Sequence, residues 1–368
     1  MIGWVLIQNG YNTTTQAVDF GNTKFYSTPD WNPEPTAALQ KHNVLLWDNM
    51  RERMVLGFED VARTQPTCDN DFNDALFYVT ATPTSSIYNP GIPRFVNGGG
   101  CPDTDGDGVN DCQDDFPNDD DRAFKVYTPY DSGFTSIGFE DLWPAKGDWD
   151  FNDLLLDINY MHVTSAENQL VDFEYTSVVR HVGATFQNGF GIEFPLTSSN
   201  LSGVTGTDYT SNIITNTAAG VEAGQSNAVV VFFDDAHDQL YDTMVISASL
   251  NSTVSFAQFV VDELNPFCIS NATRGREIHL KGKPATDLAS ASFYGQVDDI
   301  TDGSSTWYQT VDGEPWAISV SHEYAPPVES VSIENGYLKW SIWVASGGET
   351  YPDWYQNDPG YRNPANLQ

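Results

Sequence analysis

The sequence predicts an all-β chain with two β-sandwich domains of jelly-roll type, joined by a calcium-binding linker. Two observations favour strands. Short apolar segments alternate with polar residues, as in 171–175, and turn pairs such as Asn9-Gly10 separate them. A third observation argues against long helices, because no long segment repeats its apolar residues every three to four positions. With 368 residues, the chain is long enough for two or three hydrophobic cores.

The predicted domains follow the distribution of strands and turn residues along the chain. The first domain spans residues 1–86, with strands expected at 4–7, 17–20, 24–26, 43–48, 53–57 and from residue 75 to near residue 83. Residues 87–122 form the predicted linker, because they contain several prolines, three consecutive glycines and an acidic run. The second domain spans residues 123–368, with strands expected at 123–127, 154–161, 169–180, 189–194, 228–233 and 254–261.

One acidic motif occurs twice. Gly-Phe-Glu-Asp starts at Gly57 and again at Gly138, and each copy precedes an Asp-x-Asp-Phe-Asn-Asp segment and an apolar strand. A Ca²⁺ ion takes about six to eight oxygen ligands, which side chains at alternate positions can supply. The alternative is an acidic turn, which the repetition disfavours. The expected ligands are Glu59, Asp60, Asp69, Asp71, Asn73 and Asp74 in the first copy, and Glu140, Asp141, Asp148, Asp150, Asn152 and Asp153 in the second.

A third acidic run lies between the two copies and has the spacing of a calcium loop, with Gly108 at the sharp turn. The expected ligands are Asp103, Asp105, Asp107, the backbone carbonyl of Val109, Asp111 and Asp114. The flanks are not helical and the last ligand is Asp rather than Glu, so the run departs from an EF-hand. It resembles a thrombospondin type 3 repeat, a calcium-filled linker between extracellular domains.

The charge of the chain excludes several classes of partner. There are 51 acidic and 16 basic residues, a net charge of −35, which opposes binding to nucleic acid or anionic lipid. No apolar run approaches the ~20 residues of a membrane span, so we expect no membrane insertion. The acidic residues concentrate in 103–121 and in the two motif copies. This favours Ca²⁺ as the cofactor over a general adaptation to salt.

The four cysteines favour an oxidising compartment. None forms a Cys-x-x-Cys motif, which argues against zinc or thioredoxin-type chemistry. A bridge between Cys101 and Cys112 would close the acidic loop, and Cys68 would then pair with Cys268. The alternative is four unpaired thiols.

We expect no enzymatic activity. The sequence has no Gly-x-Ser-x-Gly or His-Glu-x-x-His motif and no phosphate-binding glycine loop. Paired carboxylates suit a glycosidase, but that enzyme needs one carboxyl kept protonated in an apolar site. Here the carboxylates form Asp-x-Asp clusters, in which a metal would keep them ionised. His279, which lies near two lysines, is expected to have a structural role at a strand edge.

Aromatic residues crowd the C-terminal part of the chain. Trp316, Trp343 and Trp354 are candidates for a platform that stacks on a glycan or peptide, although such rings more often belong to a core. Trp340 and Trp343 have opposite parity in a strand, so one of them is expected to be exposed.

The order of several segments resembles the LruC-domain proteins of bacterial surfaces. These segments are Phe116-Pro117-Asn118-Asp119, Arg122-Ala123-Phe124, the second motif copy, His279-Leu280-Lys281-Gly282-Lys283-Pro284, Thr286-Asp287, Pro315-Trp316-Ala317 and Asp353-Trp354-Tyr355. Residues 1–82, with His42 and the first motif copy, resemble a second bacterial module that accompanies calcium-dependent surface proteins. The resemblance implies an exported, cell-surface location and supplies no enzymatic activity.

The expected function is therefore a non-enzymatic, calcium-dependent binding or adhesion region of an extracellular bacterial surface protein. Its expected partner is an extracellular glycan or protein. The alternatives are a structural scaffold of a matrix or filament and, less favoured, a carbohydrate-active enzyme.

Overall fold

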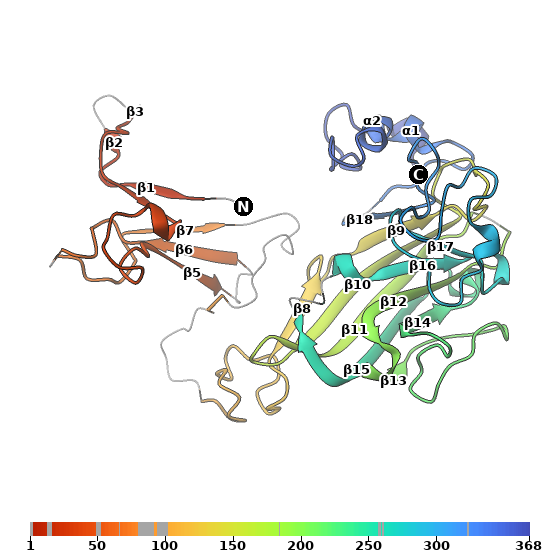
Figure 1. The fold of residues 1–368 in the computed structure, drawn as a ribbon, viewed down its shortest axis with the longest axis horizontal. Coiled ribbons are helices and arrows are strands. Elements are labelled where there is room, and N and C mark those ends of the chain that lie inside the picture. The colour runs from red at the N-terminus through yellow and green to blue at the C-terminus, as the bar shows by residue number, and fades with distance from the viewer. Residues whose placement is uncertain are drawn as a thin grey trace. The chain divides into compact units, whose positions relative to one another are not determined.

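The computed structural model describes residues 3–368 except 13–16, 49–52, 66, 80–91, 94–101, 184, 257–258, 260 and 322–323. The chain divides into two compact units, Met1–Cys101 and Pro102–Gln368 (Figure 1). Residues 102–122 of the expected linker are thus grouped with the second unit, and the domain limits taken from the sequence stay a prediction. Both units consist mainly of antiparallel strands, which confirms the all-β prediction.

Within its described residues, the first unit contains three small antiparallel sheets, β1-β4, β2-β3 and β5-β6-β7. The strands are β1 (Val5–Ile7), β2 (Tyr11–Asn12), β3 (Ala17–Val18), β4 (Lys24–Tyr26), β5 (Asn43–Asp48), β6 (Arg53–Phe58) and β7 (Ala75–Val79).

Side chains of the three-stranded sheet alternate between a buried inner face and an outer face. Leu56 and Phe58 of β6 are buried on the inner face, where Phe58 stacks on Phe77 of β7 with 6.1 Å between ring centroids. Leu76 and Tyr78 point to the other face and are 61% and 59% exposed. The period of two that predicted these strands therefore also separates core from surface.

The second unit is a sandwich of two antiparallel sheets (Figure 1). The larger sheet has the order β13-β15-β11-β10-β9-β18, with β8 also paired to β10, and the smaller has the order β14-β12-β16-β17. The strands are β8 (Phe124–Thr128), β9 (Thr135–Phe139), β10 (Leu154–Thr164), β11 (Gln169–His181), β12 (Gly189–Thr197), β13 (Leu201–Thr205), β14 (Asn227–Phe233), β15 (Thr243–Ser255), β16 (Asn265–Ile269), β17 (Glu277–His279) and β18 (Ala317–Val320).

Aromatic pairs join the two sheets of this sandwich. Phe173 of β11 stacks on Phe194 of β12 at 4.9 Å between ring centroids, and Phe139 of β9 meets Phe190 of β12 at 6.2 Å. All four rings are buried. Each such ring removes a large apolar area from water, so this inner layer supplies most of the hydrophobic stabilisation of the unit.

A second, smaller core lies on the opposite face of the larger sheet. The chain after β18 forms the short helices α1 (Ile333–Gly336) and α2 (Trp340–Ala345). Their side chains cluster with Leu155 of β10 and Ile318 of β18. The prediction from strand parity is wrong here, because Trp340 and Trp343 lie three residues apart in a helix and their rings meet at 5.0 Å.

The remaining helical elements are single 3-10 turns at Pro29–Trp31, Ser198–Asn200, Ala236–Gln239, Val261–Glu263, Ser270–Ala272, Ala291–Phe293 and Pro364–Asn366. Among the described residues, no helix has the length and apolar character needed to cross a membrane.

The predicted Cys68–Cys268 bridge is wrong. Both residues are free thiols, and they belong to different units. Cys268 lies on β16 with its side chain fully buried in the core between the sheets, so apolar packing accounts for it. Cys101 lies outside the described residues, so its bridge to Cys112 stays a prediction.

Candidate metal centres

The second motif copy forms the loop between β9 and β10. Phe139 at the end of β9 pairs with Leu154 at the start of β10, so the pairing brings both ends of the loop together. Glu140, Asp148 and Asp150 thereby place carboxylate oxygens within 4.8 Å of one another. The Asp-x-Asp spacing predicted this grouping, because side chains at alternate positions of a loop can supply oxygen ligands to one cation.

The side chain of Glu140 accepts hydrogen bonds from the backbone of this loop. It is fully buried, and its two oxygens accept hydrogen bonds from the backbone N–H of Phe151 (2.7 Å) and Trp149 (3.2 Å). Trp149 and Phe151 have φ values of 61° and 52°, a conformation that is strained for bulky residues. The strain is tolerated because it turns these N–H groups towards the carboxylates.

The electrostatics of the cluster are unfavourable without a cation. Burial, followed by the charge of Asp153, raises the pKa of Glu140 well above its usual range. Burial, followed by the charge of Asp148, raises the pKa of Asp150 to about 6. Buried carboxylates next to other carboxylates need a counter-charge or a proton. A divalent cation would supply that charge, and oxygen-only donors are the ligands that Ca²⁺ prefers.

The other expected ligands of this copy have different environments. Asp153 accepts a hydrogen bond from the backbone N–H of Asp141 (2.8 Å), and Asp141 accepts one from the Asn188 amide (2.7 Å). These two aspartates therefore close the base of the loop. Asn152 is fully buried, and its side-chain oxygen and nitrogen have no hydrogen-bond partner among the described residues. The amide oxygen of Asn152 lies against Gly183, where an added Cβ atom would be 2.2 Å from it, so the metal role of Asn152 stays a prediction.

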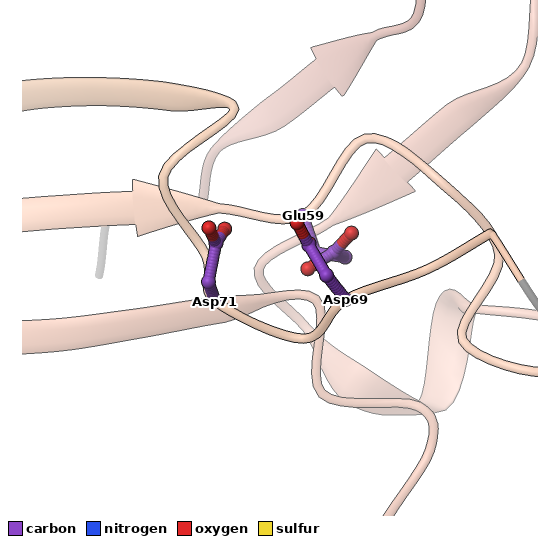
Figure 2. Close-up of side chains that lie close together, drawn as sticks. All are labelled: Glu59, Asp69 and Asp71. Atoms are coloured by element: carbon purple, nitrogen blue, oxygen red, sulfur yellow. The ribbon is translucent and has the colours of Figure 1, made fainter.

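The first motif copy repeats this geometry between β6 and β7. Glu59, Asp69 and Asp71 each place one carboxylate oxygen within 4.8 Å of the others (Figure 2). Asp74 accepts a hydrogen bond from the backbone N–H of Asp60 at 2.8 Å, which matches the Asp153–Asp141 contact of the second copy.

The backbone of the two copies also matches within the Asp-x-Asp-Phe-Asn-Asp segment, although the loop before it is two residues longer in the first copy. Asn70 and Phe72 have φ values of 58° and 56°, at the positions of Trp149 and Phe151. The backbone N–H of Asn73 donates to Asp71 at 3.1 Å, and the equivalent bond in the second copy is 3.2 Å long. The two Asp-x-Asp-Phe-Asn-Asp segments therefore have the same local geometry, and a strand follows each of them.

The two copies differ in solvent exposure. Asp150 is fully buried, whereas its equivalent Asp71 is exposed. Asp71 also accepts a hydrogen bond from the amide of Asn73 (2.5 Å), while the equivalent amide of Asn152 has no such bond among the described residues. We therefore expect the first copy to bind a cation more weakly than the second, because water screens its charges.

The third acidic loop brings together Asp103, Asp105 and Asp107, whose carboxylates lie within 4.8 Å of one another. Asp114 is 8% exposed, and burial, followed by its hydrogen bond from Phe116 and the charge of Asp107, leaves its pKa raised. One oxygen each of Asp107 and Asp114 is buried without a hydrogen-bond partner among the described residues. These orphaned oxygens and the nearby carboxylates fit a hard cation.

Two other expected ligands of this loop have backbone roles. Asp111 accepts hydrogen bonds from the backbone N–H (2.8 Å) and the hydroxyl (2.6 Å) of Thr104. Val109 donates its N–H to Asp107 (2.7 Å), and the metal role of its carbonyl stays a prediction. The sequence reasoning missed Asp119, whose N–H donates to Asp105 (2.8 Å). The signal was the run of three aspartates that begins there.

The predicted tryptophan platform is wrong for two of its three members. Trp316 and Trp354 are 0% and 2% exposed, and the indole N–H of Trp316 donates to the carbonyl of Ala145 (2.9 Å). Trp343 is partly buried and packs on Trp354 at 5.5 Å between centroids. Trp343 and Trp354 belong to the smaller core of the second unit, whereas Trp316 belongs to the core between the two sheets.

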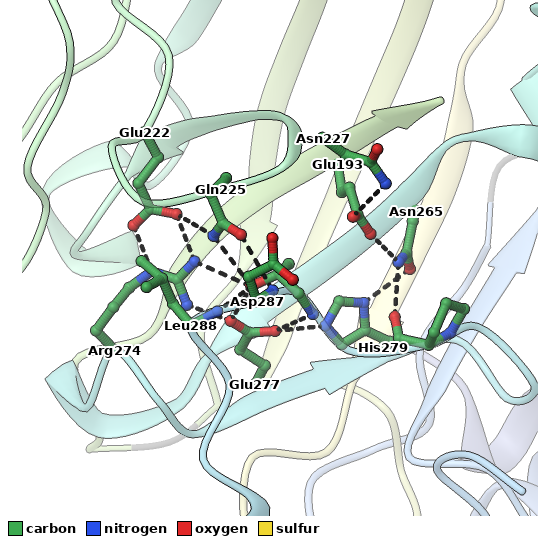
Figure 3. Close-up of polar contacts among 12 residues, drawn as sticks. Glu193, Glu222, Gln225, Asn227, Asn265, Arg274, Glu277, His279, Asp287 and Leu288 are labelled. Atoms are coloured by element: carbon green, nitrogen blue, oxygen red, sulfur yellow. Dashed lines mark hydrogen bonds and ion pairs between the residues drawn. The ribbon is translucent and has the colours of Figure 1, made fainter. Parts of the chain in front are cut away.

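A buried polar network lies at the edge of the smaller sheet (Figure 3). Arg274 pairs with Glu222 and Glu277, and the carboxylate of Glu277 accepts a hydrogen bond from His279 at 2.9 Å. His279 also contacts the amide oxygen of Asn265 at 2.7 Å, so both ring nitrogens face acceptors. His279 lies on the edge strand β17, and its contacts are those of a structural residue.

We expect Gly138→Ala to destabilise the second unit by about 1–3 kcal/mol, as overpacked sites generally do. A Cβ atom at Gly138 would lie 2.6 Å from the carbonyl oxygen of Phe151, inside the strained loop. Chemical denaturation would measure the loss. Gly3→Ala is the matched control, because a Cβ there meets no atom nearer than 4.0 Å. Equal stability of both variants would contradict the close approach.

Two family models match the chain. Residues 168–355 match the domain of unknown function DUF4842, and residues 1–82 match the domain of unknown function DUF4114. The chain is similar to a crystal structure described as a "Putative lipoprotein from Bacteroides ovatus", with a TM-score of 0.50 and 17% sequence identity over 66% of this chain and 76% of that chain. At this identity the likeness concerns the fold alone. No curated protein matches the chain. Because the DUF4842 model covers more than half of the 368 residues, the chain belongs to the DUF4842 family.

Proposed function

We propose that the chain is a calcium-stabilised, non-enzymatic binding or adhesion region of an extracellular bacterial surface protein. The observation that carries the proposal is the group formed by the buried Glu140 and Asp150 with the exposed Asp148, whose charged neighbours are further carboxylates. Such a group is destabilising unless protons or a cation neutralise it. Ca²⁺ suits its oxygen-only donors.

Bound calcium would act on structure in this proposal. Glu140, Asp148 and Asp150 would hold one ion, and Asp103, Asp105, Asp107 and Asp114 another. Glu59, Asp69 and Asp71 would hold a third at the exposed copy. Each ion would cancel the repulsion between carboxylates and fix the loop that carries them. The two strands that each motif loop joins would then be held in a fixed arrangement.

The surface location rests on resemblance and composition. The LruC-type and thrombospondin-type segments, and the fold shared with a protein described as a lipoprotein, support an exported bacterial protein. The partner is proposed to be an extracellular glycan or protein. The net charge of −35 argues against nucleic acid and anionic membranes. The second candidate is a structural scaffold, favoured by the calcium loop at residues 103–114.

Isothermal titration calorimetry with CaCl₂ tests the proposal. We expect at least three bound ions, and weaker binding of Mg²⁺, because Mg²⁺ demands a stricter octahedral shell. Binding of one ion or none would contradict the calcium role. Glycan and protein arrays probed with and without EDTA would separate adhesin from scaffold, and turnover assays on polysaccharides would reveal an enzyme.

Calcium binding is expected to release protons below neutral pH. Burial raises the pKa of Asp150 to about 6, so this carboxyl is partly protonated at pH 6 in the calcium-free chain, and burial also raises the pKa of Glu140. Between pH 4 and 7 these two carboxyls hold fewer protons in the unfolded chain than in the folded chain, so their contribution to calcium-free stability falls as pH rises. Because Ca²⁺ and protons compete for the same carboxylates, calcium binding at pH 6 should release about one proton or more per chain.

Calorimetry at pH 6 in two buffers of different ionisation enthalpy measures this release. The apparent affinity for Ca²⁺ should increase from pH 5.5 to pH 7.5. Identical binding heats in both buffers would show that these carboxylates are already ionised without calcium.

A further inference from the structure

The two motif copies share more than their loops. In the first unit, Gly57 of β6 lies opposite Val44 of β5 and Leu76 of β7. In the second unit, the equivalent Gly138 of β9 lies opposite Ile318 of β18 and Leu155 of β10. The three-stranded sheet β5-β6-β7 is therefore the counterpart of β18-β9-β10, strand for strand.

The correspondence continues one step further along the strands. Val55 of β6 lies opposite Leu46 and Tyr78. The equivalent Ser136 of β9 lies opposite Val320 of β18 and Asp157 of β10, so the strand pairing is the same although two of these positions are polar in the second unit. The first unit thus has an apolar outer face, which we define by Val44, Leu46, Val55, Leu76 and Tyr78.

The same face of the second unit is covered. Leu155, Ile318 and Val320 are 1%, 4% and 4% exposed, because the aromatic segment 324–354 packs on them. That segment also donates the backbone N–H of Ser330 to Asp150 (3.0 Å) and that of Ile333 to the carbonyl of Trp149 (2.6 Å). One cover therefore shields both the apolar residues and the carboxylate loop.

The outer face of the first unit has no such cover among the described residues. Leu76 is 61% exposed, although its counterpart Leu155 is 1% exposed. Tyr78 is 59% exposed and lies under the guanidinium of Arg53 at 4.1 Å. Arg53 in turn pairs with Asp48 at 3.4 Å, so its charge is already matched. Large apolar groups gathered on one sheet face indicate an interaction surface.

We propose that this outer face docks an aromatic, positively charged polypeptide segment of another protein. Its aromatic side chains would occupy the place that Tyr337 and Trp340 occupy on the second unit. A backbone N–H would reach Asp71 as Ser330 reaches Asp150. This inference names the partner class of the proposed binding region and rests on that proposal.

Charge decides between this occupant and a second copy of the chain. The net charge of −35 opposes self-association, and the face ends at the acidic first motif copy. A segment with lysine or arginine next to its aromatic residues complements that border. Because salt screens charges, binding of such a segment should weaken as the salt concentration rises.

The test uses the full chain and two synthetic peptides labelled for fluorescence anisotropy. The first peptide is residues 329–356 of this chain, and the second is the same peptide with Glu334→Lys and Glu349→Lys. We expect both to bind, and the lysine peptide to bind more tightly at low salt. Leu76→Glu in the chain should weaken binding at least about tenfold, the effect of losing a central apolar contact. Val311→Glu, at a 79% exposed valine of the second unit, is the matched control.

The outcomes separate this inference from the proposed function, because Ca²⁺ binding is measured independently by calorimetry on the same samples. No binding of either peptide at about 1 mM, the weak limit of specific association, overturns the docking face. Equal affinity for the chain and its Leu76→Glu variant places the peptide elsewhere, for instance on the second unit in exchange for its own cover. A dimer that Leu76→Glu dissolves in sedimentation velocity assigns the face to a second copy and overturns the proposal.

Discussion

Removal of calcium with EDTA is expected to lower the melting temperature of the chain sharply. A ligand that binds only the folded state stabilises it by about 2.7 kcal/mol per site at a hundredfold excess over its Kd. Three sites would together contribute roughly 8 kcal/mol, which compares with the ~5–15 kcal/mol by which folded domains are stable. The carboxylates would also repel one another once the ions are gone. The measurement is differential scanning calorimetry with CaCl₂ and with EDTA.

The variant Asp148→Asn should change the stability of the chain in different directions with calcium and with EDTA. Asp148 lies with the buried Glu140 and Asp150 in one carboxylate group, but its own side chain is exposed. With calcium, the variant should be less stable than the parent chain, because a ligand and its charge are lost. With EDTA it should be at least as stable, because one repulsive charge is removed. Asp312→Asn, at an exposed aspartate outside the clusters, is the control.

If Asp148→Asn shifted the melting temperature equally in calcium and in EDTA, the loop would be a solvated acidic turn. A melting temperature that does not respond to EDTA at all would remove the basis for a calcium-stabilised fold. Small-angle scattering on the same samples would show whether the loop at residues 103–114 also controls the spacing of the two units.

The grouping of Glu140, Asp148 and Asp150 was predictable because it depends on local spacing. Oxygen side chains at alternate positions are typical of a calcium loop, and the flanking apolar residues identified the strands that close the loop. The roles of Asp141 and Asp153 were not predictable. An aspartate that accepts a backbone N–H and one that binds a metal have the same sequence signal, and the neighbouring strands decide between them.

The cover of the second unit shows a different limit. Trp340 and Trp343 lie in a helix of six residues, which is too short for a periodic pattern to reveal. Tertiary contacts with Leu155 and Ile318 select the helix, and these contacts link residues far apart in the sequence. The same separation hid the pairing of Glu222 with Arg274, because charged residues on different segments carry no mutual signal.

Arg274→Met is expected to destabilise the second unit by about 3–5 kcal/mol, the range for breaking one partner out of a buried ion pair. The side chain of Arg274 is 12% exposed, and those of its partners Glu222 and Glu277 are 1% and 0% exposed. Burial alone would raise the pKa of Glu277, but the hydrogen bond from His279 and the charge of Arg274 lower it to about 2. Glu277 is therefore ionised at neutral pH, and removal of Arg274 would leave two buried carboxylates with less compensation.

Arg122→Met is the matched control, because Arg122 also pairs with two carboxylates, Asp119 and Asp172, but is 33% exposed. Water screens that pair, so its loss should change the free energy of unfolding by about 0–1 kcal/mol. Urea denaturation of both variants in saturating calcium measures the difference. If Arg274→Met were no more destabilising than Arg122→Met, water would have to reach Glu222 and Glu277 in solution. In that case the network around His279 would be an accessible polar site, and the structural role assigned to it would be wrong.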